Sequence, residues 1–141
     1  MANPGPASTQ TIHPQNVLSN QSIRLLAVFT GVNVNATGDT ANLKIANASN
    51  WSVSNVVFTN ASISLTTAAA GLFTAPSGGG TAIVANAALS ALTASTVVSQ
   101  RTVASTAIQT GENLYVNVGT AQGAAATMDV YVYGYDFATY S

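Results

Sequence analysis

The chain has 141 residues, the length of a single domain, and 48% of them are hydrophobic, which argues against disorder. Only 5% are charged, against about 25% in an ordinary soluble domain, and the net charge is −1. Three scattered basic residues cannot supply the phosphate contacts of a nucleic-acid-binding protein, and the absence of cysteine excludes disulfides and thiolate metal sites. No stretch reaches the ~18 apolar residues of a membrane span, so we expect neither a nucleic-acid nor a membrane partner.

The N-terminal residues 1–21 are polar and contain three prolines, which fix φ and remove backbone donors. We expect an extended arm here, followed by a single β-sandwich domain at residues 22–141. A disordered tail is the alternative, because polar termini are often disordered. The segment has no basic start followed by an apolar run, so we expect no secretory signal and a protein that stays where it is made.

The first strong strand signal lies at residues 22–34 (SIRLLAVFTGVNV). Both faces of this segment are apolar, which predicts a strand near the middle of a sheet. A turn is expected at residues 35–40, where Gly38 can adopt a positive φ, followed by a short strand at 43–46. Residues 51–59 alternate between apolar and polar and then change phase, which is typical of a strand with a β-bulge.

The central part of the chain has weaker signals. Residues 63–65 predict a short alternating strand, and residues 68–74 are a further strand candidate. The sequence PSGGG at 76–80 predicts a flexible loop, because glycine lacks the side chain that restricts the backbone.

One helix is expected in the chain. Residues 82–84 are typical of a strand, and the following segment, 86–95, predicts a short helix. Leu89 and Leu92 stand at helical spacing there, and Asn86 is a suitable N-cap.

The C-terminal third returns to strand patterns. Residues 96–99 and 102–108 are β-branched, which predicts two strands, and a turn follows at 109–113. The cleanest alternation in the chain lies at 114–137, where we expect a C-terminal hairpin. Its connecting loop, 119–126, carries no group that exchanges a proton at neutral pH.

Tyrosines dominate one side of this expected hairpin. Met128, Val130 and Val132 point to one face, which predicts core, and the residues between them point to the other. We expect an aromatic wall on that second face, either covered by the arm or a loop, or serving as an interface. With two arm residues added, the candidate interface consists of Tyr115, Tyr131, Tyr133, Tyr135, His13 and Pro14.

The order of elements predicts an all-β fold. Short strands separated by turn signals, without a long helical pattern, favour a two-sheet β-sandwich with either jelly-roll or immunoglobulin-like topology. The strand order does not follow from the pattern.

Candidate catalytic groups are few. His13, the single histidine, lies in the arm, so a serine–histidine pair would require the arm to dock. Asp129 and Asp136 are separated by an odd number of residues, which predicts opposite faces of one strand, and Asp39 and Glu112 lie in separate turns. A calcium site could draw ligands from distant segments, but no acidic loop supports one. We expect no catalytic site, no cofactor, no metal site and no enzymatic activity.

Three C-terminal segments together resemble a known family. These are ENLYVNV at 112–118, DVYVYGYDF at 129–137 with a small-residue loop before it, and TAIVANAALSALTAS at 81–95. They are similar to the cement or decoration proteins of tailed-bacteriophage capsids, particularly those of short-tailed phages. The first half of the chain is similar to this family only in composition.

The resemblance implies a jelly-roll-like β-sandwich with an extended arm that binds the outside of a capsid and cements neighbouring major capsid subunits. It implies location on the outer capsid surface of a virion assembled in the host cytoplasm. The partners would be the major capsid protein and the protein itself, as a homodimer or, less favoured, a trimer. Two alternatives stay open: a carbohydrate-binding module that uses an exposed tyrosine face, and a fibre or pilus-type subunit.

Overall fold

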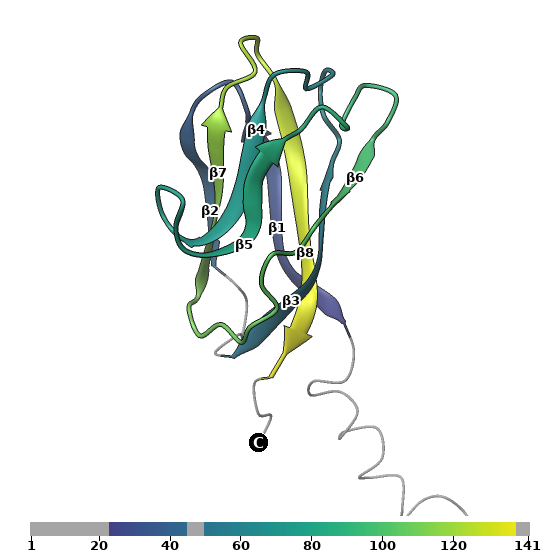
Figure 1. Cartoon of the computed structure of the whole chain (residues 1–141). Coiled ribbons are helices and arrows are strands. Elements are labelled where there is room, and N and C mark those ends of the chain that lie inside the picture. Colours follow the sequence, from purple (N-terminus) through teal and green to yellow (C-terminus); the bar gives the residue numbers. More distant parts are fainter. Residues whose placement is uncertain (1–22, 45–49, 138–141) are drawn as a thin grey trace, which may run out of the picture.

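The computed structural model describes residues 23–44 and 50–137, with side chains described outside 40–44. The arm at 1–21, with His13 and Pro14 of the candidate interface, lies outside the described residues. Two antiparallel sheets of four strands face each other (Figure 1). The predicted all-β sandwich is confirmed, and the described residues contain no helix.

The two sheets divide the eight strands equally. One sheet has the order β1 (Arg24–Asn33), β8 (Thr127–Asp136), β3 (Trp51–Thr59) and β6 (Val98–Arg101). The other has the order β2 (Gly38–Lys44), β7 (Asn113–Thr120), β4 (Ala69–Ala75) and β5 (Gly79–Ala88).

This strand order is that of an eight-stranded jelly roll. β1 pairs with β8, β2 with β7, β3 with β6 and β4 with β5, so the chain forms one long folded ribbon. Two further pairings, β3 with β8 and β4 with β7, close the rolled ribbon into sheets. Of the two topologies that the sequence left open, the structure has the jelly roll.

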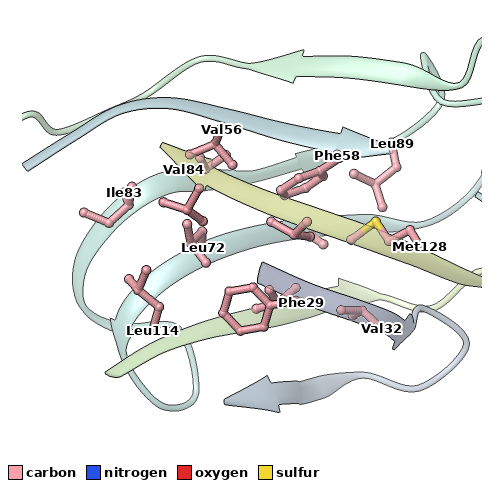
Figure 2. Packing of buried hydrophobic residues seen from close by; sticks show 14 of the residues in the cluster. Phe29, Val32, Val56, Phe58, Leu72, Ile83, Val84, Leu89, Leu114 and Met128 are labelled. Atoms are coloured by element: carbon pink, nitrogen blue, oxygen red, sulfur yellow. The ribbon is translucent and has the colours of Figure 1, made fainter. Parts of the chain in front are cut away.

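The core lies between the inner faces of the two sheets. In β8 every second residue from Met128 is buried, and β7 buries Leu114, Val116 and Val118 in the same way, because successive side chains leave a strand on opposite sides. Figure 2 shows inward-pointing side chains from both sheets meeting in this layer. Leu65, from the segment that follows β3, is also fully buried in the core.

The expected C-terminal hairpin is wrong. β7 and β8 follow each other in the sequence but belong to different sheets, so the loop between them passes from one sheet to the other. Each strand lies between two other partners: β8 between β1 and β3, and β7 between β2 and β4. Alternation reports which face of a strand is buried, but it contains no information about the neighbouring strand.

The expected central position of the first strand is also wrong. β1 is an edge strand, and Ile23 and Leu25 are 51% and 48% exposed. The register against β8 shifts between Leu25 and Ala27, so Leu26 and Ala27 both face the core. A bulge therefore produces the two-sided apolar pattern that resembled a central strand.

The expected helix at 86–95 is wrong, since β5 continues to Ala88 and a single turn follows. The N–H of Leu92 donates to the carbonyl of Leu89 at 2.8 Å, and both leucines are fully buried. One turn therefore suffices to place the two side chains in the core.

The strands expected at 63–65 and 102–108 are absent from the structure, and PSGGG forms a tight turn between β4 and β5. Gly79 N–H donates to Pro76 O at 3.1 Å in that turn. By contrast, the bulge in β3 is confirmed, since the register shifts between Val53 and Asn55. Gly38 has the expected positive φ, 101°, but β2 begins at this residue, so the turn expected at 35–40 ends earlier and the strand expected at 43–46 starts at Gly38.

Candidate interface

A tyrosine row runs along the outer face of the β1-β8-β3-β6 sheet. Tyr131, Tyr133 and Tyr135 of β8 are half-buried and alternate with buried residues, as the sequence predicts. β8 is a central strand of this sheet, so the row lies in the middle of the sheet and not at its rim. Each ring is flanked by side chains of β1 or β3.

The register shows which side chains lie beside the tyrosines. Tyr131 stands between Val28 of β1 and Val57 of β3. Tyr133 stands between an exposed leucine of β1 and an asparagine of β3. The tyrosine face, as we use the term below, comprises Leu25, Val28, Asn55, Val57, Tyr131, Tyr133, Tyr135 and Phe137.

The tyrosine face is aromatic at the C-terminal end of β8. The rings of Tyr135 and Phe137 stack with centroids 6.2 Å apart and an interplanar angle of 15°. Offset stacking of this kind stabilises the two rings relative to each other. A partner would therefore meet a preformed aromatic surface.

Charge is sparse on this side of the sheet. Asp129 continues the outward row of β8, and its carboxylate accepts hydrogen bonds from Gly31 N–H at 2.8 Å and from Asn60 Nδ2 at 2.9 Å. These bonds tie the end of β1 to the segment after β3. The carboxylate therefore has a structural role at one end of the outward row of β8.

Tyr115 does not join the other tyrosines. It lies on β7, paired with Phe73 of β4, in the other sheet of the sandwich. The expected single aromatic wall is thus divided between two outer faces. The reason is the same as for the hairpin, because β7 and β8 enter different sheets.

The remaining acidic residues lie apart. Asp39 accepts hydrogen bonds from Ser77 N–H at 2.7 Å and Asn117 Nδ2 at 3.1 Å, which hold the β4–β5 turn against β7. Asp136 is 2% exposed and pairs with Arg24 at 3.8 Å. Asp129 and Asp136 face opposite sides of β8, as their odd spacing predicts. Among the described residues no cluster of metal-ligating side chains occurs.

The structure also contains a hollow that the sequence did not predict. A hollow of about 290 Å³ lies between β5 and β6, with Val84, Ala85 and Ala87 on one side and Gln100 and Arg101 on the other. Those two strands follow each other in the chain but end the orders of two different sheets. The hollow therefore depends on how the rims of the two sheets approach each other, which the sequence pattern does not predict.

Comparison with protein-family models, curated proteins and solved structures found no match to the chain. Within the described ranges, no helix has the length and apolar character needed to cross a membrane.

Proposed function

We propose that this chain is a structural virion protein that binds the outer surface of a phage capsid and cements neighbouring major capsid subunits. The observation that carries the proposal is the tyrosine face, an aromatic and nearly uncharged surface in the middle of a jelly-roll sheet. Interfaces are enriched in tyrosine and depleted of charge at their centres, and this face has both properties.

Two further observations support a structural role. Asp39 and Asp129 accept hydrogen bonds within the chain, which is what carboxylates with a structural role do. The C-terminal segments resemble cement proteins, and jelly rolls occur in viral capsid domains. The chain acts without catalysis and without a cofactor under this proposal.

The partners follow from the same surface. The tyrosine face binds the major capsid protein, and copies of the chain associate with each other as a homodimer in preference to a trimer. A low net charge of −1 favours such association, because little repulsion opposes it.

The test measures the heat stability of capsids with and without the protein. Purified particles that lack the chain are incubated with it, and DNA release is followed on heating. We expect the bound chain to raise the temperature of release. No change in that temperature at saturating occupancy would contradict the proposal.

Matched variants locate the contact. Tyr131→Ala combined with Tyr133→Ala should weaken particle binding about tenfold or more, since buried tyrosines are typical hot spots. Tyr115→Ala, on the other outer face, is the control and should bind like the unmodified chain. Thermal unfolding of each variant alone separates a lost contact from a lost fold.

A carbohydrate-binding module is the second candidate, and the spacing of the tyrosines favours it. Alternate residues of one strand stand about 7 Å apart, so the three rings form a platform on which successive sugar rings could stack. Jelly rolls also host lectin domains. Glycan-array binding that disappears in the double tyrosine variant, without any effect on capsids, would favour this function.

A further inference from the structure

The hollow between β5 and β6 lies where the outer strands of the two sheets approach each other. β5 ends the order of one sheet and β6 ends the order of the other. Small apolar side chains, Val84, Ala85 and Ala87, line the β5 side, so a ligand backbone can approach that strand closely. The opposite side consists of Gln100, Thr102, Ala104 and the single charged residue of the hollow, Arg101.

Arg101 is a positioned cation without an anionic partner in the described part of the chain. Its Cζ lies 5.3 Å from the ring centroid of Phe58, which is fully buried, so the aromatic ring holds the guanidinium in place. Burial lowers the pKa of Arg101 from its ordinary value. A guanidinium that is partly removed from water gains most when a carboxylate binds it through two hydrogen bonds.

The outer edge of β5 is open over part of its length. This strand spans Gly79–Ala88 without a charged residue or a proline, two of the devices that keep an edge from pairing, although its register against β4 shifts between Ala70 and Ala75. Ala104 N–H donates to Ile83 O at 2.7 Å, which covers one point of the edge. Beyond it, the described residues place no strand beside Ala85 and Ala87, both of which are exposed.

We infer that this hollow binds an extended acidic peptide segment of a partner protein. The segment adds its backbone along the outer edge of β5, and an Asp or Glu side chain places its carboxylate against Arg101. Charge complementarity indicates a carboxylate as the ligand group. The single positive charge of Arg101 neutralises one carboxylate, whereas a phosphate group carries more negative charge than one guanidinium neutralises. Strand addition supplies the main-chain hydrogen bonds, as in other edge-strand complexes.

This contact is separate from the tyrosine row of β8, although Gln100 of the hollow is paired with Val57 of the tyrosine face. Val84 and Ile83 of β5 belong to the sheet that lacks the tyrosine row, and the hollow opens at the side of the sandwich. The inference therefore goes beyond the proposed function, and its test requires no capsid.

The experiment titrates the full ¹⁵N-labelled chain with a blocked pentapeptide, acetyl-Thr-Val-Glu-Val-Thr-amide, and records backbone and arginine side-chain NMR shifts. We expect saturable shifts at Arg101, Ala85 and Ala87. The same peptide with Gln in place of Glu should bind at least about tenfold more weakly, since the charge-assisted hydrogen bonds to Arg101 are lost. This comparison uses the unmodified protein and so needs no folded variant.

Two variants and one small probe complete the test. Arg101→Gln should abolish the preference for Glu over Gln, and Arg101→Lys should retain part of it. Sodium acetate should shift Arg101 but leave the amides of Ala85 and Ala87 unmoved. Equal binding of the two peptides, shifts elsewhere on the chain, or no binding at millimolar peptide would overturn the inference. Acetate binding without any peptide-induced shift in β5 would overturn it as well, because the site would then take carboxylates alone.

Discussion

At the scale of single residues, Gly134 shows why the sequence of β8 reads as it does. Gly134 occupies a buried position of the alternation, between Val132 and Asp136, whose side chains are also buried. A Cβ built there would collide with the backbone of Ser52, and it would lie 2.9 Å from the Cα of Val53. The strand pair β3–β8 therefore approaches so closely at the bulge that only glycine fits.

Gly134→Ala is therefore expected to destabilise the protein by about 1–3 kcal/mol, the usual cost of forcing extra atoms into a packed core. Chemical denaturation followed by the emission of Trp51 measures this, because the single tryptophan is fully buried. Gly111→Ala is the control, as nothing lies within 4 Å of a Cβ at that position. Equal stability of the two variants would show that the backbones are not in close contact at Gly134.

Asn55 is a second informative residue, because its position in β3 carries an unmet polar group. Its Oδ1 atom is buried, and the structure gives it no hydrogen-bond partner. A buried acceptor without a donor costs free energy, and valine at a β-strand position carries no such cost. Thr59, on the same strand, differs because its hydroxyl donates to the carbonyl of Val97.

We expect Asn55→Val to raise the free energy of unfolding by about 1 kcal/mol and Thr59→Val to lower it by about the same amount. Thermal and urea unfolding of both variants provide the measurement. A loss of stability in Asn55→Val would mean that the amide is satisfied in solution. If Asn55→Val gains stability but loses capsid or glycan binding, the amide serves the partner and not the fold.

At the scale of elements, bulges decide which side chains reach the core. Register shifts occur in β1 between Leu25 and Ala27 and in β3 between Val53 and Asn55. Each shift turns one residue around, so a simple period of two fails there while it holds throughout β8. β8 is the central strand that both bulged strands flank, and its regular alternation produces the unbroken tyrosine row.

The strand pairing is open to a direct test because the chain contains no cysteine. Val57→Cys with Tyr131→Cys should form a disulfide on mild oxidation, since paired residues of antiparallel strands have Cα atoms about 4.5–5.5 Å apart. Tyr115→Cys with Tyr131→Cys should stay reduced at low protein concentration, because β7 and β8 lie in different sheets. Mass spectrometry of peptide digests distinguishes the outcomes. A disulfide between positions 115 and 131 would mean that β7 and β8 pair as a hairpin, which would contradict the structure.

At the scale of the whole molecule, the jelly roll joins the two ends of the described chain. β1 pairs with β8 and β2 with β7, so most sheet contacts connect segments distant in sequence. Loop closure must precede such pairings, which makes folding slow and exposes strand edges meanwhile. The proposed association with neighbouring subunits suits a surface that has few charges to keep molecules apart.

Refolding from denaturant should therefore take milliseconds to seconds, the range of β-sandwiches with distant strand pairs. Stopped-flow emission of Trp51 reports it, because this residue is fully buried and its backbone pairs with Asp136 of β8 and with Gln109. Tyr115→Ala should leave the rate nearly unchanged, since Tyr115 points away from the core. Refolding within microseconds would contradict a topology of this kind.

Much of the fold was readable from the sequence, for a definite physical reason. Alternation in β7 and β8 follows from the pleat, so it correctly predicted the core side of Met128, Val130 and Val132 and the outward side of the tyrosines. The low charge, the lack of cysteine and the turn at Gly38 are likewise properties of the chain itself. The alternating pattern and the turn signals together predicted an all-β sandwich with an aromatic outer row.

Only the tertiary structure decided which strands are neighbours. Pairing depends on contacts between distant segments, and a local sequence pattern contains no information about those contacts. For this reason the sequence could not separate Tyr115 from Tyr131, reveal β1 as an edge strand, or bring Arg101 to β5. The stretch from Leu89 to Leu92 shows the same limit, because a single turn buries two leucines at this spacing as well as a helix does.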